Sequence, residues 1–217
     1  MGRYAIIGNP VKTSKSPRLF RIAYPQTSGD TYSILEGSDA VKCWEKVLEM
    51  DLDGVNVTMP FKKDLLEVAD VITPGAAKAN ATNLMVRQND LWIAYNTDIY
   101  GVVQSFKGSG IDPAGKKALV IGAGGAGRAA FVGLEQAGAT VYMANRTVRE
   151  GLHSLSHVPW LVRQCDLIVN TIPWDSSTAG CLGLEQKHTV LDASYTLKPL
   201  QDATTVAGAK YLNGYHW

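Results

Sequence analysis

The amino-acid sequence predicts an α/β protein that is divided into two domains. Its 217 residues suffice for one large domain or two small ones. Short, continuous apolar runs alternate with segments of helical pattern, which is typical of parallel strands covered by helices on both faces. The pattern restarts after a stretch of turn residues, Gly108 to Pro113, so we place the domain boundary between about Asp98 and Gly115.

The first hundred residues contain three apolar runs that end at turn or breaker residues, which marks them as strands. These runs are residues 4–7, 32–35 and 55–58. Two further runs, at 82–87 and 91–95, flank turn residues and predict an antiparallel hairpin. This half is therefore expected to be α/β with an antiparallel edge.

Helices are expected between these strands. One begins at Ser16, which would be the N-cap before Pro17, and a second is capped by Ser38-Asp39. A third should cover roughly residues 62–69. The buried face of the second helix is expected to carry Val41, Trp44 and Leu48.

The second half predicts parallel strands that alternate with helices. The strands are the apolar runs at residues 118–121, 141–144, 167–169 and 190–191. A helix is expected from Asp98 to about Lys107. Another follows the glycine-rich residues 122–127 and runs to Ala137, where Gly138 ends it.

Composition and charge exclude several classes of protein. Apolar residues make up 46% of the chain, which excludes a disordered protein. Basic residues number 21 and acidic residues 20, and the formal charge of +1 disfavours general nucleic-acid binding. Three cysteines without a C-x-x-C pair predict neither disulfides nor a metal site. No apolar stretch reaches the ~18 residues of a membrane span, and no signal peptide is evident, so we expect a cytoplasmic protein.

The segment from Gly122 to Gly127 matches the pattern G-x-G-x-x-G between an expected strand and an expected helix. That context indicates a Rossmann-type dinucleotide-binding loop, in which glycines permit a tight turn and let the backbone approach a pyrophosphate. The helix N-terminus adds N–H donors for the anion. A glycine-rich turn without a ligand is the alternative. The residues expected at the cofactor are Gly122, Ala123, Gly124, Gly125, Ala126 and Gly127.

The end of the following strand indicates which dinucleotide is bound. Proteins that bind NAD place an acid there, about 20 residues further on, to hold the ribose 2′-hydroxyl. This chain has Asn145, Arg146 and Thr147 and no carboxylate at that place. Because arginine makes charge-assisted hydrogen bonds to phosphate, the sequence favours NADP over NAD.

Polar residues gather near the strand ends of the first half. Ligands of α/β sheets bind beyond the carboxyl ends of the strands, and this set of groups suits a small, hydroxyl-rich, anionic ligand. The residues are Ser14, Ser16, Asn56, Thr58, Lys62, Asn83 and Asp98. Structural roles compete with this interpretation, since Ser16 and Asp98 could each cap a helix and Lys62 could be a solvated lysine like Lys63.

Four groups of segments together resemble the shikimate dehydrogenase family, and their order and spacing cover nearly the whole chain. They are residues 7–11 with 14–17, residues 54–62, Asn83 with Asn96-Thr97-Asp98, and residues 122–127 with 145–147. The second group, GVNVTMPFK, is similar to the family signature N-V-T-x-P-F-K.

The resemblance implies a fold, a reaction and several roles. The fold would be an N-terminal α/β substrate-binding domain (residues 1–98) and a Rossmann-type NADP-binding domain (99–217) with a cleft between them. The reaction would be NADP-dependent interconversion of 3-dehydroshikimate and shikimate, on the route to chorismate and the aromatic amino acids. The catalytic pair would be Lys62 and Asp98. The substrate would be held by Ser14, Ser16, Asn56, Thr58, Asn83 and Tyr195. The nicotinamide would lie near Thr171, Ile172, Pro173 and Gly214.

The chemistry can also be argued from the residue types. Hydride transfer to a ketone develops negative charge on the ketone oxygen, which a lysine ammonium can stabilise and protonate. A neighbouring carboxylate favours the charged lysine and orients it. Two alternatives stay open: a quinate/shikimate dehydrogenase of broader specificity, and a non-catalytic NADP-binding sensor on the same fold. We expect a monomer or a homodimer.

Three features depart from the family pattern. Thr13 stands where the family commonly has histidine, at a peripheral position. Leu84 stands where the family usually has threonine after the asparagine, which would remove one polar contact. The family's C-terminal helical segment, with its substrate-binding glutamine, is expected to begin where this sequence stops, at Trp217.

Overall fold

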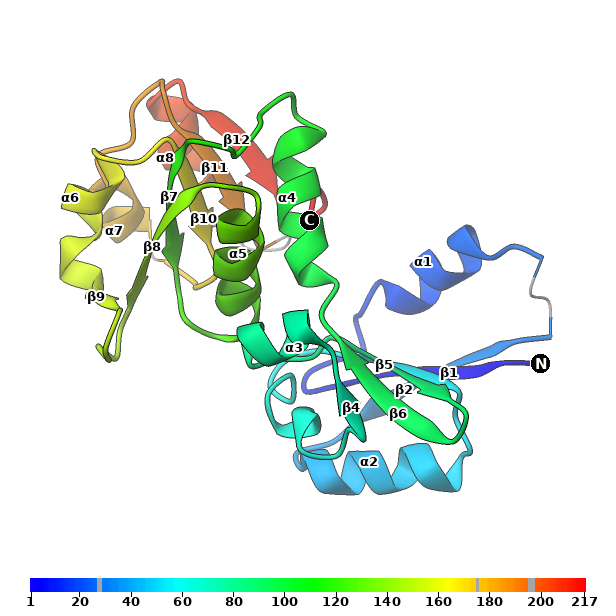
Figure 1. Ribbon diagram of the computed structural model, residues 1–217. Helices are drawn as coiled ribbons and strands as arrows, with labels where there is room; N and C mark the ends of the chain where they lie inside the picture. Colours follow the sequence, from blue (N-terminus) through cyan, green and yellow to red (C-terminus); the bar gives the residue numbers. More distant parts are fainter. Residues whose placement is uncertain (27–28, 175, 195–197) are drawn as a thin grey trace. The chain divides into compact units, whose positions relative to one another are not determined.

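The structure is a computed structural model that describes residues 1–26, 29–174, 176–194 and 198–217. The chain divides into two compact units, Met1–Thr97 and Asp98–Trp217, which we describe one at a time (Figure 1). Within the described ranges, no helix combines the length and the apolar character needed to cross a membrane. The same residues contain no cluster of three or more histidine, cysteine or acidic side chains that could hold a metal ion.

The first unit is built, within its described residues, on a six-stranded sheet of order β2-β1-β3-β5-β6-β4. Its strands are β1 (Arg3–Gly8), β2 (Thr31–Glu36), β3 (Gly54–Val57), β4 (Val71–Ile72), β5 (Leu84–Gln88) and β6 (Leu91–Tyr95). Strands β1, β2 and β3 are parallel, whereas β5 pairs antiparallel with β3 and with β6. The backbone N–H of Asn9 donates to the carbonyl of Met59 (2.9 Å), so the loops after β1 and β3 lie side by side.

The helices of this unit are α1 (Ser16–Ala23), α2 (Ala40–Glu49) and α3 (Pro74–Ala79), with a short 3-10 helix at Asp64–Leu66. Helices α1 and α2 lie on opposite faces of the sheet (Figure 1). The core is on the α2 face, where Trp44 packs edge-on to Trp92 with ring centroids 4.8 Å apart. Helix α1 buries no residue completely, and its Phe20 ring contacts the rings of Tyr4 and Tyr32.

The predicted strands and hairpin of this unit are confirmed, but the helix predicted over residues 62–69 is wrong. Only Asp64–Leu66 form a short 3-10 helix. In an α-helix the carbonyl of Lys62 would accept from the N–H of Leu66, but here it accepts from the N–H of Thr82 (2.7 Å). Pairing with a distant segment thus replaces the helix. The elements β4 and α3 are not predicted from the sequence.

The predicted buried face of α2 is also wrong. Val41 and Leu48 are 59% and 55% exposed. The buried residues are Cys43, Trp44 and Val47. Trp44 belongs to both the predicted and the observed apolar face of this helix, so the sequence pattern does not decide which face is buried. The packing of Trp44 against Trp92 on β6 decides it. The N-cap of α2 is Asp39 as predicted, since its carboxylate accepts from the N–H of Lys42 (3.0 Å).

The second unit is built, within its described residues, on a six-stranded sheet of order β12-β11-β10-β7-β8-β9, in which every neighbouring pair is parallel. Its strands are β7 (Lys117–Ile121), β8 (Thr140–Asn145), β9 (His153–Ser154), β10 (Leu167–Asn170), β11 (Thr189–Asp192) and β12 (Lys210–Asn213). In chain order this arrangement reads 3-2-1-4-5-6, the order of a doubly wound nucleotide-binding fold. The strand order reverses between β7 and β10.

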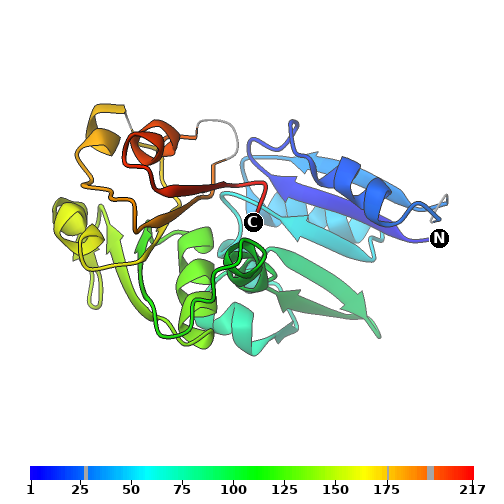
Figure 2. The same ribbon diagram turned by 90° about the horizontal axis from the view of Figure 1, so that it is seen from above.

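Helices cover both faces of the second sheet (Figure 2). They are α4 (Asp98–Lys107), α5 (Gly125–Gln136), α6 (Val158–Val162), α7 (Ser176–Gly180) and α8 (Gln201–Val206), with a 3-10 helix at Leu155–His157. Residues of β7 alternate between two cores: Val120 packs with α4 and α5, whereas Leu119 and Ile121 pack with α6, α7 and α8. The strands and helices predicted for this half are confirmed, and β9, β12, α6, α7 and α8 are not predicted from the sequence.

Candidate active site

The glycine-rich loop joins β7 to α5 and has the conformation that its sequence predicts. Gly122 has φ +104°, which is accessible to glycine. A Cβ at Gly127 would overlap the carbonyl oxygen of Gly122, so the helix can approach the turn only with glycine there. Gly124, the N-cap of α5, is exposed, and a Cβ there would meet no atom within 4 Å. The loop thus leaves open space beside the helix N-terminus, which fits a dinucleotide pyrophosphate.

The end of β8 lies beside this loop. The side-chain oxygen Oδ1 of Asn145 accepts from the N–H of Ala123 (3.4 Å), and its side-chain nitrogen Nδ2 donates to the backbone carbonyl of Thr147 (3.1 Å). Asn145 therefore connects the glycine-rich loop to the turn that carries Arg146, whose side chain is exposed. This arrangement fits a ribose 2′-phosphate beside a guanidinium, as the residue types predict.

The loop after β10 packs directly on the glycine-rich loop. The Thr171 hydroxyl donates to the carbonyl of Ile121 (2.8 Å), and a Cβ at Gly122 would overlap that hydroxyl. Ile172 and Pro173 follow in the same loop, at the point of the sheet where the strand order reverses and where ligands bind in this fold. Gly214 directly follows β12. Tyr195, another candidate, lies outside the described residues.

Ser14 and Ser16 form a hydroxyl pair in the first unit. The Ser14 hydroxyl lies 3.2 Å from that of Ser16 and accepts from the Ser16 N–H (3.2 Å). Helix α1 begins at Ser16 with Lys15 as its N-cap, so the predicted N-cap role of Ser16 is wrong. Its hydroxyl is instead in hydrogen-bonding contact with Tyr32 of β2.

Tyr32 connects the serine pair to Asn56. Its hydroxyl donates to the Asn56 side-chain oxygen over 2.5 Å. Burial raises the pKa of the Tyr32 hydroxyl to about 12, despite an opposing hydrogen bond with Ser16, so it stays a neutral donor at physiological pH. Sequence reasoning missed this tyrosine. The signal is the register of the sheet. Tyr32 lies opposite Tyr4 of β1, and Asn56 lies opposite Ile6, two positions further along the same strand. Positions two apart share one face of a sheet, so both side chains are on the same face.

Thr58, Lys62 and Asn83 gather where β3, β5 and β6 meet. The Thr58 N–H donates to the carbonyl of Ile7 (2.9 Å) directly after β3. Asn83 accepts on its backbone carbonyl from the N–H of Val57 (2.9 Å), and the carbonyl of Lys62 accepts from Thr82, one residue before Asn83. Lys62 is half-buried, whereas its neighbour Lys63 is exposed. This difference weakens the interpretation of Lys62 as a solvated lysine.

The Asn83 side chain holds the end of the first unit. Its amide nitrogen donates to the Thr97 hydroxyl (2.8 Å), and its oxygen accepts from the Thr97 N–H (2.8 Å). Asp98 follows in sequence and is the first residue of α4 in the second unit. Most candidate residues in the described ranges lie near a strand end or in the segment that follows it, whereas Asn83 directly precedes β5 and Asp98 is the first residue of α4.

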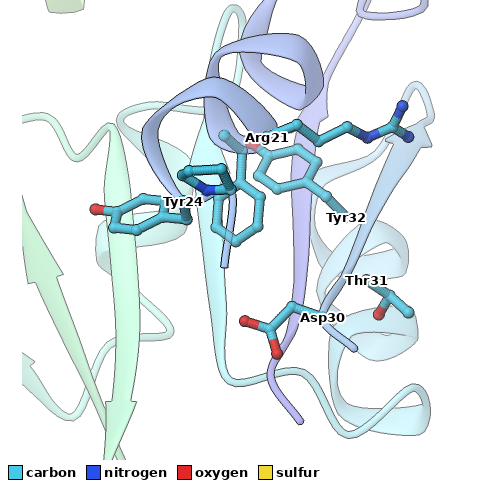
Figure 3. Close-up of a pocket in the computed structure, with 7 residues that line it drawn as sticks. Arg21, Tyr24, Asp30, Thr31 and Tyr32 are labelled. Carbon is cyan, nitrogen blue, oxygen red and sulfur yellow. The ribbon is translucent and has the colours of Figure 1, made fainter. Parts of the chain in front are cut away.

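Two cavities lie on the α1 face of the first unit. One, of about 450 Å³, is lined by Tyr4, Phe20, Tyr24, Asp30, Tyr32 and Asn56 together with further residues of β1, β3 and β5. The other, of about 470 Å³, is lined by Phe20, Arg21, Tyr24, Pro25, Asp30, Thr31 and Tyr32 (Figure 3). Neither lining contains Thr58, Lys62 or Asn83, so neither cavity is where these groups would hold a substrate.

Comparison with known proteins identifies the family. Residues 6–85 match the model of the shikimate dehydrogenase substrate binding domain. The shikimate dehydrogenase (NADP(+)) of Halorubrum lacusprofundi is 34% identical over 242 residues, which cover 99% of this chain and 88% of that protein. The chain belongs to the shikimate dehydrogenase family. The shikimate dehydrogenase (NADP(+)) of Halobacterium salinarum, 33% identical with the same two coverages, agrees.

Solved structures of shikimate dehydrogenases have the same fold. The enzyme of Aquifex aeolicus has a TM-score of 0.85 at 28% identity, with 100% of this chain and 87% of that chain covered. The shikimate 5-dehydrogenase of Thermus thermophilus in complex with NADP(H) and shikimate has a TM-score of 0.84 at 25% identity, with 100% and 88% covered. These likenesses confirm the predicted fold class, a substrate-binding α/β unit followed by a Rossmann-type unit.

Proposed function

We propose that this chain is an NADP-dependent shikimate dehydrogenase that interconverts 3-dehydroshikimate and shikimate. The observation that carries the proposal is that one chain of this family contains two features. One is a glycine-rich loop followed by Arg146, and the other is a half-buried Lys62 within the family signature. The first unit would bind the substrate and the second the dinucleotide. The match of residues 6–85 to a substrate binding domain supports the first assignment.

The substrate would be bound by the polar groups of the first unit. Ser14, Ser16, Asn56, Thr58 and Asn83 offer hydroxyl and amide groups that can donate to a carboxylate and exchange hydrogen bonds with the hydroxyls of shikimate. The Tyr32 hydroxyl fixes the Asn56 amide, because it already donates to the Asn56 oxygen. That leaves the Asn56 amide N–H groups for the ligand. Tyr195, outside the described residues, is proposed to bind the substrate carboxylate.

Lys62 and Asp98 would carry the chemistry at the reacting oxygen. The nicotinamide, when bound, supplies or accepts the hydride. In the reduction of 3-dehydroshikimate, the Lys62 ammonium stabilises the negative charge that develops on the ketone oxygen and donates a proton from Nζ. Asp98 is proposed to keep Lys62 charged and oriented. In the reverse direction, the hydroxyl proton of shikimate is transferred to Lys62 Nζ.

The dinucleotide would be held by residues of the second unit. Backbone N–H groups of residues 122–127 would bind the pyrophosphate, and Arg146, placed by Asn145 and Thr147, would bind the 2′-phosphate. Thr171, Ile172, Pro173 and Gly214 are proposed to lie beside the nicotinamide. A cytoplasmic location and a monomeric or homodimeric state stay predictions from the sequence.

One spectrophotometric experiment tests the proposed function against its alternatives. The absorbance of the reduced nicotinamide is followed, as NADPH with shikimate plus NADP⁺ and then as NADH with quinate plus NAD⁺. Turnover only in the first mixture is the expected result. Turnover in both would indicate a quinate/shikimate dehydrogenase of broader specificity. NADP⁺ binding without turnover in either would indicate a sensor and would overturn the proposal.

A further inference from the structure

A buried carboxylate at the carboxyl end of β11 is bonded to both neighbouring strands of the second unit. Asp192, the last residue of β11, has no exposed surface. One of its oxygens accepts from the amide of Asn170 on β10 (3.1 Å) and from the N–H of Ser194 (3.3 Å). The other accepts from the N–H of Leu200 (3.2 Å) and from the hydroxyl of Tyr211 on β12 (3.2 Å). The carboxylate therefore has a donor from each neighbouring strand and two from the loop that follows its own.

Asn170 connects Asp192 to the loop after β10 through hydrogen bonds. Its amide nitrogen donates to Asp192 and to the carbonyl of Ile172 (2.8 Å). Its oxygen accepts from the N–H of Ile172 (3.3 Å) and from the indole N–H of Trp174 (2.7 Å). All hydrogen-bonding positions of this amide are in use, so its orientation, and with it the backbone of Ile172, is fixed.

The loop fixed in this way lies against the glycine-rich loop. Thr171 donates to the carbonyl of Ile121, and Thr171 and Ile172 fill the space where a Gly122 Cβ would be. Strands β7 and β10 meet at the reversal of the strand order, where a dinucleotide crosses the sheet in this fold. A shift of the loop at residues 171–174 would therefore move the surface beside the dinucleotide. The turn at the end of β8, which we assign to the 2′-phosphate, takes no part in this network.

We infer that Asp192 is a positioning residue of the reaction: through Asn170 it holds the loop of residues 171–174 in the place where the nicotinamide half of NADP binds. The inference rests on the proposed function for the identity of the cofactor. It goes beyond that function because it assigns Asp192 an effect on the binding of one half of the dinucleotide and not of the other. The adenosine half should bind independently of Asp192, whereas the nicotinamide half should not.

The test is Asp192→Asn. The asparagine amide places an NH₂ group where one carboxylate oxygen of Asp192 accepted hydrogen bonds. The Tyr211 hydroxyl can rotate and accept from this NH₂ group. A backbone N–H of Ser194 or Leu200 is then left facing a donor, and the loops must shift.

Calorimetric titrations measure the Kd of NADP⁺ and of adenosine 2′,5′-bisphosphate, a probe without nicotinamide. We expect the Kd of NADP⁺ to rise roughly tenfold and that of the bisphosphate to change less than about twofold. The kcat should fall on the order of tenfold to a hundredfold at saturating substrate.

His188 provides a matched control at the opposite end of the same strand. It directly precedes β11, is 1% exposed, and is fixed by the Glu185 N–H on Nδ1 (2.7 Å) and by the Val162 carbonyl at Nε2 (3.0 Å). His188→Ala should lower the melting temperature as much as Asp192→Asn or more. It should leave both Kd values and kcat unchanged at a temperature where the protein is folded.

The outcomes separate the inference from the proposed function. If Asp192→Asn raises the Kd of NADP⁺ and of the bisphosphate equally, the role of Asp192 is merely structural and the inference is overturned. The same holds if His188→Ala changes the Kd values and kcat as much as Asp192→Asn does. If Asp192→Asn does not fold, Tyr211→Phe removes one of the four donors and should give the same selective loss to a smaller degree. Its absence would overturn the inference as well. A wild-type chain that binds NADP⁺ but does not turn over shikimate would overturn the proposed function and leave the titration result standing.

Discussion

The indole Nε1 of Trp217 donates a hydrogen bond to the backbone carbonyl of Asp98 over 3.1 Å. The same indole lies against Gly101, where a Cβ would come within 2.8 Å of Trp217 Cδ1. Ser105, one turn further along α4, donates from its hydroxyl to the carbonyl of His216 (2.7 Å). The segment after β12 therefore runs along α4 and fixes the first turn of that helix. The carboxylate proposed to orient Lys62 begins this turn.

Trp217→Phe tests whether this contact matters for catalysis. Phenylalanine keeps an aromatic ring against Gly101 but removes the donor to Asp98. The free energy of unfolding should fall by about 0.5–1.5 kcal/mol, and kcat should fall several-fold because the first turn of α4 loosens. Ser105→Ala is the matched control, since it removes a bond to the same segment but not to Asp98, and kcat should be unchanged. Equal kcat values for the two variants would show that the Trp217 contact is only structural.

Lys62→Ala should lower kcat far more than it weakens shikimate binding. The ammonium is needed most when charge develops on the ketone oxygen, so its loss should reduce kcat on the order of a hundredfold or more. The KM for shikimate should change only a few-fold. Steady-state kinetics on the wild type, Lys62→Ala and Lys63→Ala provide the comparison, because Lys63 is the exposed neighbour on the same loop. Turnover close to wild type in Lys62→Ala would refute the assigned role.

Much of the fold could be predicted because the strands are short apolar runs bounded by turn and breaker residues, and both are local signals. Residues 62–69 show where this fails. Their composition permits a helix, but a hydrogen bond from Thr82 to the carbonyl of Lys62 competes successfully with helix formation. The buried face of α2 fails for the same reason, since Trp44 of α2 finds its partner Trp92 on a strand almost fifty residues away. Neither contact is encoded in a local window.

Arg146→Ala should weaken NADP⁺ selectively. A charged hydrogen bond to phosphate is worth roughly 1.5–3 kcal/mol, which predicts an increase in the KM for NADP⁺ of about tenfold to a hundredfold. The KM for NAD⁺ should barely change, since NAD⁺ lacks the 2′-phosphate. Arg163→Ala, an exposed arginine after α6, is the control and should affect neither cofactor. Equal losses for NADP⁺ and NAD⁺ in Arg146→Ala would point to a role in folding.

Tyr32→Phe should reveal the raised pKa of the Tyr32 hydroxyl. The folded-state pKa of about 12 lies above the ordinary value of 10.0, because burial disfavours the phenolate. The bond to Asn56 therefore contributes stability that is fully present below pH 10 and is lost as the pH rises toward 12. Melting temperatures of the wild type and Tyr32→Phe should differ by a constant amount from pH 6 to 9 and converge above pH 10. A difference that already shrinks below pH 9 would contradict the assignment.

The candidate site was predictable where sequence segments carry the chemistry and unpredictable where side chains meet across strands. The glycine-rich loop, Arg146 and Lys62 stand in recognisable local patterns. Tyr32 stands in none, because its bond to Asn56 spans the width of β1, between the two strands that carry them. The Asp192–Asn170 bond likewise joins residues 22 positions apart, and only the register of β10 with β11 brings them together.

Gly124→Ala and Gly127→Ala should separate the two uses of glycine in the dinucleotide loop. A methyl group at Gly127 overlaps the carbonyl of Gly122, so Gly127→Ala should lower the free energy of unfolding by about 1–3 kcal/mol even without cofactor. Gly124 has φ −75° and open space around it, so alanine is tolerated and stability should change by less than about 0.5 kcal/mol. Its methyl group nevertheless occupies the space where the pyrophosphate approaches the backbone, and NADP⁺ should bind on the order of tenfold more weakly. Denaturant unfolding and calorimetric titration measure both quantities. A Gly124→Ala variant that binds NADP⁺ as tightly as the wild type would show that the cofactor does not approach the loop at this residue.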